Sequence, residues 1–419
     1  MKSVWPRVRM KFVLTKIGSG KTPLGGAETY VSSGVMLLRS QNIHFNGLRV
    51  DDVVFVDEAT DAEMASTSVR SGDVLLNITG ASLGRCTVVP ENAPRANVNQ
   101  HVCILRPNPS RIIPRYLNAV AQSVVVQDQI FAWENGSSRE GLTFEQVGNL
   151  EITLPSLPEQ VQVAHFLDRE ATRIDTLVAA EERWLERLAE KRRALITHAI
   201  TRGIDPRAPL RDSGLPWLGQ IPAHWETERA KWLFREREER SETGDEELLT
   251  VSHLTGVTRR SEREVYMFEA ETTEGYKICQ AGDLVINTLW AWMGAMGVSP
   301  LNGIVSPAYN VYTPCGRLDS TYVDALVRVP VFAEEATRFS KGVWTSRLRL
   351  YPEGFFEIIM PIPPLTEQRA IVDHIQRETA KLEAVRVAAE RTIGLLKERR
   401  SSLIAAAVTE SLAVETLPV

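Results

Sequence analysis

The sequence Leu154-Pro155-Ser156-Leu157-Pro158-Glu159-Gln160 decides the organisation of this chain, because it returns 208 positions later as Pro361-Ile362-Pro363-Pro364-Leu365-Thr366-Glu367-Gln368. No proline interrupts either copy in the forty residues that follow its Glu-Gln pair. Apolar residues then recur every seven positions. They are Leu167, Ile174, Leu188 and Leu195 in the first copy, and Ile375, Leu382, Ala389, Leu396 and Leu403 in the second. This period is typical of long helices that pair along an apolar seam.

The two repeated segments therefore predict two helices that pair with each other. Glu181 interrupts the first seam, with Leu177 and Trp184 on either side of it. At about 1.5 Å per residue, each helix is roughly 60 Å long. An ordinary buried helix pair inside one globule is the alternative. The length of the helices and the sequence between the two copies favour an antiparallel coiled coil instead.

The blocks outside the helices also form a tandem duplication. Ser71-Gly72-Asp73-Val74-Leu75-Leu76-Asn77 matches Ala281-Gly282-Asp283-Leu284-Val285-Ile286-Asn287 at an offset of 210. Short apolar runs at 35–38, 53–56, 72–76 and 102–105 predict strands, and 113–129 and 322–339 predict one helix in each block. The predicted fold class is α+β. It consists of two similar domains with twisted sheets, related by a pseudo-two-fold axis and separated by two long antiparallel coiled-coil helices.

The predicted boundaries follow from this duplication. Residues 1–155 form the first domain and 156–203 the first spacer helix. Residues 204–360 form a linker and the second domain, and 361–419 hold the second spacer helix. The joint at 203–222 is rich in Gly and Pro, which is typical of a linker or clamp loop.

Composition excludes several classes of protein. The 419 residues are 43% hydrophobic, and no apolar run approaches the roughly 20 residues of a membrane span. The four cysteines have no C-x-x-C spacing, which disfavours zinc and a disulfide framework and favours a reducing cytoplasm. The net charge of −5 is concentrated at 203–364, where 17 basic residues face 23 acidic ones. Simple nucleic-acid binders are usually basic.

The chain resembles the specificity (S) subunit of Type I restriction–modification systems. The doubled Glu-Gln helix start carries the resemblance, together with the junction Leu215-Pro216-Trp217-Leu218-Gly219-Gln220-Ile221-Pro222-Ala223-His224-Trp225. Gly282-Asp283 and Ser306-Pro307-Ala308-Tyr309 resemble the family's second recognition domain.

This resemblance implies two target recognition domains, each reading one half of a bipartite site in double-stranded DNA. It implies that the helices set the gap between the half-sites and dock two methyltransferase subunits, and in the full complex restriction subunits as well. It implies no cofactor in this chain, with S-adenosylmethionine, ATP and Mg in the partner subunits. It also implies a cytoplasmic, non-catalytic subunit. The acidic second half departs from the family, because a broad surface that binds DNA phosphates requires an excess of basic residues.

The residues themselves offer little catalytic chemistry. Thr15-Lys16-Ile17-Gly18-Ser19-Gly20-Lys21-Thr22 ends like a phosphate loop, but Thr15 stands where that motif needs glycine, and Pro23 opposes a following helix. No tetrad for amino methylation and no metal-ligand spacing of histidines is present. Catalysis is therefore expected in another chain.

Polar and basic side chains in turns are candidates for DNA contact, because Arg, Asn and Gln offer the paired groups that base edges require. The candidates in the first block are Lys16, Ser19, Lys21, Arg39, Asn42, Asn77, Thr79, Arg85, Asn99, Gln100 and Arg139. Those in the second block are His253, Arg259, Arg260, Asn287, Trp290, Trp292, Tyr309, Lys341, Trp344 and Arg347. For each of them, a solvated turn without a ligand is the plainer reading.

Two further hypotheses belong to other classes. A non-enzymatic coiled-coil scaffold whose two blocks bind proteins would suit the acidic balance. It would show no preference for a particular DNA sequence. An autonomous enzyme would need activity in the purified chain alone, and we expect none.

Overall fold

The computed structural model describes residues 5–23, 25–134, 141–262, 272–343 and 347–409. The chain divides into two compact units. The first comprises Met1–Glu181 with Glu390–Val419, and the second comprises Glu182–Ala389. Both long helices contribute to both units, so each unit contains part of one helix packed against part of the other.

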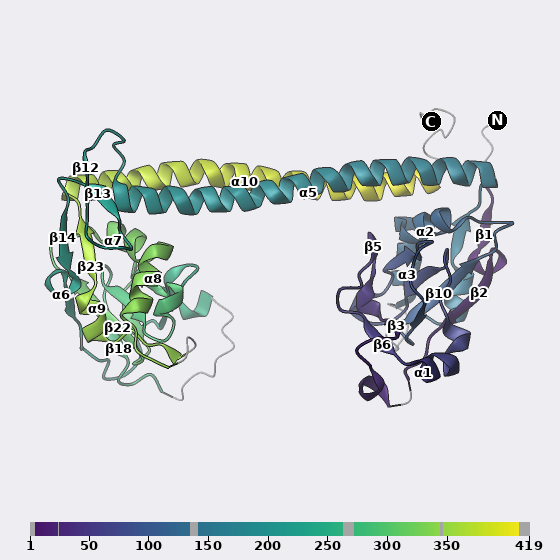
Figure 1. Ribbon diagram of the computed structural model, residues 1–419, viewed down its shortest axis with the longest axis horizontal. Helices are drawn as coiled ribbons and strands as arrows, with labels where there is room; N and C mark the ends of the chain where they lie inside the picture. The colour runs from purple at the N-terminus through teal and green to yellow at the C-terminus, as the bar shows by residue number, and fades with distance from the viewer. Residues whose placement is uncertain (1–4, 24, 135–140, 263–271, 344–346, 410–419) are drawn as a thin grey trace. The chain divides into compact units, whose positions relative to one another are not determined.

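The first unit is built on a four-stranded antiparallel sheet (Figure 1). In spatial order its strands are β2 (Leu14–Ser19), β10 (Val102–Pro107), β7 (Val74–Asn77) and β8 (Cys86–Val88). Leu75 stands opposite Ile104 in the register. The strands at the centre are buried on both faces, which explains why the sequence shows continuous apolar runs there.

A second layer of the first unit holds β3 (Val35–Leu38), which runs parallel to β9 (Ala96–Val98) and antiparallel to β6 (Val54–Val56). Two short hairpin strands, β4 (Ile43–His44) and β5 (Gly47–Leu48), follow β3. The N-terminal strand β1 (Arg7–Arg9) pairs with β11 (Glu151–Thr153). The helices outside the long pair are α1 (Glu58–Glu63), α2 (Pro114–Gln122), α3 (Val124–Glu134) and α4 (Phe144–Asn149).

The second unit repeats this plan. Its four-stranded sheet has the order β15 (Phe234–Glu236), β22 (Tyr309–Pro314), β19 (Leu284–Asn287) and β20 (Met296–Val298). Beside it lie the hairpin of β16 (Leu249–Ser252) and β17 (Gly256–Arg259), and the pair of β18 (Lys277–Cys279) and β21 (Gly303–Val305). The outer pair is β14 (Glu226–Arg229) with β23 (Ile359–Ile362). The junction after the first long helix forms β12 (Leu210–Asp212) and β13 (Gln220–Pro222).

The short helices of the second unit are α6 (Ala230–Leu233), α7 (Ser320–Val327), α8 (Pro330–Arg338) and α9 (Pro352–Glu357). The single helices predicted at 113–129 and 322–339 are each two helices. The prediction was wrong because Pro330 disfavours helical geometry at Val329, which is extended at ψ 141°. Ser123 occupies the same break in the first unit, and its hydroxyl donates to the Val120 carbonyl that ends α2.

The two long helices are α5 (Leu157–Arg202) and α10 (Leu365–Val408). They lie side by side and antiparallel in each unit (Figure 1). In the first unit, Val163 and Leu167 near the start of α5 share a core cluster with Ala407 and Val408 at the end of α10. In the second unit, Ala199 and Ile200 share a core cluster with residues near the start of α10, namely Ile371, Val372 and Ile375.

The seven-residue seam is the packed face of this pair. Leu167, Ile174 and Leu188 of α5 are buried, as are Ile375 and Ala389 of α10. Leu382, Leu396 and Leu403 are partly exposed. The predicted fold class, two similar α+β domains with paired long helices, is confirmed. Among the described residues, no helix is long and apolar enough to cross a membrane.

A repeated glutamine ties each helix start to its own unit. Gln160 is fully buried, accepts from Ile113 N at 2.9 Å, and donates to the carbonyls of Arg111 and Pro155 at 2.9 Å. Gln368 makes the same three bonds, to Asp319 N at 2.8 Å, Arg317 O at 3.0 Å and Pro363 O at 2.8 Å. The Glu-Gln repeat in the sequence is therefore a repeated connection between helix and domain.

The repeated Gly-Asp pair is also structural, but its partner differs between units. Buried Asp73 accepts two bonds of 2.8 Å from Arg106 at the end of β10. Asp283 instead accepts from Arg237, just after β15, at 2.7 Å, and from Thr313, which occupies the place of Arg106. The hydrogen bond to the carboxylate raises the pKa of each arginine.

Candidate nucleic-acid interface

One end of the sheets in the first unit gathers four loops from distant parts of the sequence. Gly20 N, after β2, donates to Asn99 O at 3.0 Å, and Asn99 N donates to Leu38 O at the end of β3 at 3.1 Å. Asn77, at the end of β7, donates its side-chain amide to Ser40 O at 2.8 Å. The segments 19–22, 39–42, 77–85 and 99–101 are therefore neighbours. We call this the loop edge of the first unit.

Close backbone contact explains the glycine at position 20. A Cβ atom there would lie 1.5 Å from the carbonyl oxygen of Val98, so no other residue fits without moving the backbone. In the sequence, Gly20 lies in the stretch Thr15–Thr22, which resembles a phosphate loop only at its end. In the structure it brings the β2 loop against the turn that carries Asn99 and Gln100.

The loop edge presents a connected set of polar side chains. Thr79 Oγ1 lies 2.6 Å from His101 Nδ1, and Gln100 Nε2 lies 3.1 Å from His101 Nε2. Thr22 Oγ1 donates to the side-chain oxygen of Gln100. Lys21, Thr22 and Gln100 are exposed, and Ser19, Thr79 and Asn99 are partly exposed. Side chains of this kind can donate to and accept from base edges or phosphates.

Two predicted residues of this edge hold the loops together instead of facing solvent. Asn42 and Asn77 are both fully buried. Asn42 Nδ2 donates to Arg49 O at 2.8 Å and to Asp52 Oδ1 at 3.2 Å. Both amides are buried in this structure, where their printed hydrogen bonds join the loops of the edge to one another.

The remaining candidates of the first unit differ in their burial and in their distance from the loop edge. Arg39 is partly buried and donates to Asp52 O at 3.1 Å. Arg85 lies in the β7 loop, where its carbonyl accepts from Asn77 N. Lys16 is three residues from the loop edge, beside Arg106 and in contact with Ser66 O, and burial lowers its pKa. Arg139 lies outside the described residues.

The second unit builds the same edge from corresponding segments. Leu350 N donates to Thr288 O at 3.1 Å, as Leu142 N donates to Ile78 O at 2.8 Å in the first unit. Thr288 Oγ1 donates to Ala308 O at 2.8 Å. The loop after β19, the turn before β22 and the loop before α9 therefore meet. This is the loop edge of the second unit.

A shallow basic hollow opens at this second edge. It is lined by Leu289, Lys341, Gly342, Arg347, Arg349 and Tyr351. The backbones of Lys341 and Arg349 exchange two hydrogen bonds of 2.9 Å, which holds these two positions side by side. The three cationic side chains are exposed, and Lys341 also pairs with Glu353 at 3.2 Å. A concentration of positive charge thus exists inside an acidic unit.

Two tryptophans, Trp290 and Trp292, follow the lining residue Leu289 in the chain. Trp290 follows Leu289 in the chain and is half exposed. Its ring stacks on that of Trp292, with centroids 6.3 Å apart and planes inclined by 16°. Trp292 Nε1 donates to Leu289 O at 3.0 Å, which fixes the orientation of the Trp292 ring. An exposed, pre-oriented indole face can stack on a base or sugar.

The other candidates of the second unit lie elsewhere or inside it. Asn287 is 7% exposed, and its side-chain oxygen accepts from Leu289 N. Tyr309 is partly buried against the core. His253 is exposed in the β16–β17 turn, which Arg328 ties to α7 through Leu254 O at 2.9 Å.

At the other end of that hairpin, Arg259 lies 3.8 Å from Glu247 and 3.6 Å from Glu262. Arg260 follows it directly and is partly exposed. Trp344 lies outside the described residues.

Sequence reasoning missed Thr22, His101, Arg349 and Tyr351. His101 follows Gln100 directly, and Arg349 stands two positions from Arg347, so both lay next to chosen residues. The backbone bridge between positions 341 and 349, which the sequence does not show, places Arg349 in the hollow.

Comparison with known proteins agrees with this architecture. Residues 65–183 match the family model for the Type I restriction modification DNA specificity domain. A protein of Methanocaldococcus jannaschii named as type I restriction enzyme MjaX specificity subunit is 22% identical over 53% of this chain and 51% of its own length. The type I restriction enzyme EcoBI specificity subunit of Escherichia coli is 24% identical over 33% of this chain and 29% of its own. These sequence matches span about half or less of the relatives.

Two solved structures share the fold along nearly the whole chain. One is a chain from a structural study of complex assembly and conformational transition in the type I R-M system. It is 18% identical, covers 98% of this chain and 99% of its own, and has a TM-score of 0.71. The other, the HsdS subunit from Thermoanaerobacter tengcongensis, is 18% identical with 98% coverage of both chains and a TM-score of 0.57. The resemblance indicated by the Glu-Gln repeat and the junction motif is confirmed.

Proposed function

We propose, from the premise that this chain belongs with the type I restriction–modification specificity subunits, that it selects the DNA sequence on which such a complex acts. Each unit reads one half of a bipartite site through its loop edge. The chain contributes recognition, and the methyltransferase subunits, with restriction subunits where present, contribute the chemistry. S-adenosylmethionine binds in the methyltransferase subunits, and ATP and Mg are used by the restriction subunits.

The observation that carries this proposal is the repeated loop edge. The four-stranded sheets of the two units have the same strand order, and each unit exposes a different set of polar, basic or aromatic side chains at its loop edge. The first offers Lys21, Thr79 and Gln100, while the second offers Trp290, Arg347 and Arg349. A shared framework with different exposed groups suits two readers of different base sequences, because groove edges are read by side-chain donors and acceptors.

The basic hollow supports DNA binding by an acidic unit. Phosphate contacts need local cations, not a positive net charge, and each one releases condensed counterions from the duplex. Lys341, Arg347 and Arg349 supply three such cations in one place. Trp290, which follows Leu289 of the hollow in the chain, adds an exposed aromatic surface.

The long helices support the docking of partners. In the first unit Leu177 of α5 and Leu395 of α10 are 46% and 54% exposed. In the second unit Trp184, Val385 and Val387 are 48%, 42% and 52% exposed. Apolar side chains on the outer faces of paired helices suit protein contacts, and we assign them to the methyltransferase subunits.

Methylation mapping tests the proposal. We expect that the methyltransferase subunit combined with this chain methylates one bipartite sequence, and that omission of the chain abolishes that selectivity. Gln100→Ala should relax or weaken one half-site only. Gln162→Ala, on the exposed face of α5, serves as the matched control. Equal binding to random and selected duplexes at one stated salt concentration would instead favour the protein scaffold.

A further inference from the structure

Gln100, at the loop edge of the first unit, has its side-chain amide held on both sides. Thr22 Oγ1 donates to the Gln100 oxygen, and Gln100 Nε2 lies 3.1 Å from His101 Nε2. The other ring nitrogen, His101 Nδ1, lies 2.6 Å from Thr79 Oγ1. Gln100 is exposed, whereas His101 and Thr79 are partly buried. An exposed amide is therefore fixed by a partly buried ring, which a threonine fixes in turn.

The hydrogens of this network follow from the donors and acceptors that are present. An amide nitrogen donates and cannot accept, so His101 Nε2 accepts from Gln100 and carries no hydrogen. The neutral imidazole then has its hydrogen on Nδ1, which donates to Thr79 Oγ1. Reversal of the amide would place its oxygen against the ring, and Nε2 would have to carry the hydrogen. The orientation of the Gln100 amide and the tautomer of His101 are therefore coupled.

This orientation decides what Gln100 offers to a ligand. Among the described residues, the amide of Gln100 makes these two hydrogen bonds and no other, so one N–H and one oxygen lone pair remain. In the major groove adenine presents the acceptor N7 beside the donor N6, and a glutamine amide can bind both. Guanine presents two acceptors there, and cytosine presents a donor. An amide held in one orientation therefore favours adenine.

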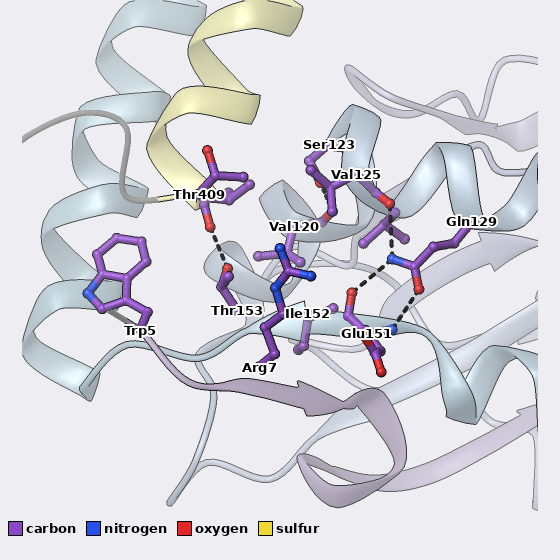
Figure 2. A pocket seen from close by; sticks show the side chains of 12 residues that line it. Trp5, Arg7, Val120, Ser123, Val125, Gln129, Glu151, Ile152, Thr153 and Thr409 are labelled. Carbon is purple, nitrogen blue, oxygen red and sulfur yellow. Dashed lines mark hydrogen bonds between the residues drawn. The ribbon is translucent and has the colours of Figure 1, made fainter. Parts of the chain in front are cut away.

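Gln129 in the same unit shows how an amide is used for structure alone. Figure 2 shows it in a pocket, on α3 and beside Glu151 of β11. Its Nε2 donates to Val125 O at 2.9 Å and to Glu151 O at 3.0 Å, and its oxygen accepts from Glu151 N at 2.8 Å. Both N–H groups of Gln129 are thus used inside the unit, whereas Gln100 keeps one for a ligand.

The second unit does not repeat the side chains of this network. Val102 and Tyr309 occupy equivalent places, since each pairs with the asparagine that ends the adjacent strand. The two residues before Val102 are Gln100-His101, whereas the two before Tyr309 are Pro307-Ala308. Framework contacts, such as those of the buried glutamines at the two helix starts, are made in both units. A contact made in one unit alone suits the reading of one half-site.

We propose that His101 is the positioning residue that sets the orientation of the Gln100 amide. Gln100, held in this way, binds an adenine in the half-site that the first unit reads. The inference rests on the proposed function, because it requires the loop edge to contact base edges. His101 acts through Gln100, and its own contact with the base is not needed.

Two substitutions that differ in what they offer to Gln100 test this role. His101→Lys presents only donors and should turn the amide oxygen toward position 101. His101→Glu presents only acceptors and should keep the nitrogen there, as the neutral imidazole does. The backbone of position 101 donates to Asn99 Oδ1 at 3.1 Å and accepts from Ile78 N at 3.0 Å, and both bonds are independent of its side chain.

The measurement is competition between duplexes for the complex of the full chain with the methyltransferase subunit. The duplexes carry the bipartite site found by methylation mapping, with each base pair of the first unit's half-site replaced in turn. The added charges of the variants change phosphate binding, which is independent of base sequence, so the ratio between duplexes isolates the base contact. The half-site of the second unit should be read unchanged in every variant, which shows that the chain is folded.

The wild-type chain should prefer adenine at one position by about 5- to 150-fold, the range for one bidentate contact. His101→Glu should keep this ratio, and His101→Lys should abolish it. Gln100→Ala should abolish it too, and adding His101→Lys to Gln100→Ala should change nothing further. Gln129→Ala is the matched control and should leave the ratio unchanged. Replacing the adenine by 7-deazaadenine, which lacks the N7 acceptor, should weaken binding to the wild-type chain but not to Gln100→Ala.

Several results would overturn the inference. An equal loss of the adenine preference in both His101 variants would mean that the ring only supports the turn. A full preference in His101→Lys would mean that the ring does not orient the amide. An effect of 7-deazaadenine that persists in Gln100→Ala would assign the contact to another residue. In all three cases the wild-type complex still selects a site, so the proposed function stands. A wild-type complex that selects no site would overturn both.

Discussion

At the scale of single residues, the repeated Gln160 and Gln368 show how a polar side chain can hold a helix to a domain. Each is buried and satisfies two carbonyls and one amide N–H. An apolar replacement of similar size leaves all three backbone groups without partners. The cost of such unsatisfied groups exceeds the gain from removing the buried amide.

We predict that Gln160→Met lowers the free energy of unfolding by about 1–3 kcal/mol. The same change at the exposed Gln162 should stay within about 0.5 kcal/mol. Chemical denaturation of both variants measures the difference. Equal stability of the two variants would mean that the three hydrogen bonds contribute nothing net.

A second prediction concerns the basic hollow. Arg347→Ala and Arg349→Ala should each weaken binding to any duplex, and each should reduce the slope of log K against log salt by about 1. Arg207→Ala, at an exposed arginine of the same unit outside the hollow, is the control and should leave the slope unchanged. Titrations at several salt concentrations measure both quantities. Unchanged slopes for the hollow variants would place phosphate binding elsewhere.

At the scale of elements, the sequence predicted what periodicity controls. The seven-residue repeat identified both long helices, and the apolar runs identified four strands within one or two residues. The break at Ser123 was not predictable, because it depends on a buried hydroxyl that terminates α2. The burial of Asn42 was equally hidden, since its partner Asp52 meets it only after the β4–β5 hairpin forms.

The candidate site could be predicted by segment more readily than by residue. Turn residues after strands marked the loops that meet at each edge. Whether a given side chain faces outward or holds the loops depends on contacts between segments far apart in sequence. Asn77 and Gln100 looked alike as candidates, but only Gln100 is exposed.

The paired helices lead to a prediction at the same scale. Insertion of four residues, about one helical turn, into α5 between Leu177 and Leu188, with a matching insertion in α10, should lengthen the unread gap by about one to two base pairs. Both half-sites should stay the same. Methylation mapping reads the gap directly. New half-sites with the old gap would contradict a spacer role for the helices.

At the scale of the whole molecule, the proposed function predicts that the two units read their half-sites separately. Replacing residues 1–155 with the same segment of a relative should change one half-site and leave the other intact. The reciprocal exchange of residues 204–360 is the control and should change the other half. Methylation mapping of both exchanges checks the assignment. A single exchange that altered both halves would show that the units do not read independently.

The arginine that binds the aspartate of the Gly-Asp pair comes from a different part of the fold in each unit. This difference limits where genes for such chains can recombine. Asp73 takes its partner from β10, whereas Asp283 takes its partner from beside β15. A crossover inside the sheet that joined the front of the first unit to the back of the second would leave the buried Asp73 carboxylate without its arginine, with a threonine in that place. The opposite crossover would crowd two guanidinium groups onto one acid. Viable recombinants should therefore carry their breakpoints in the helices, so that evolution exchanges these readers as intact cassettes.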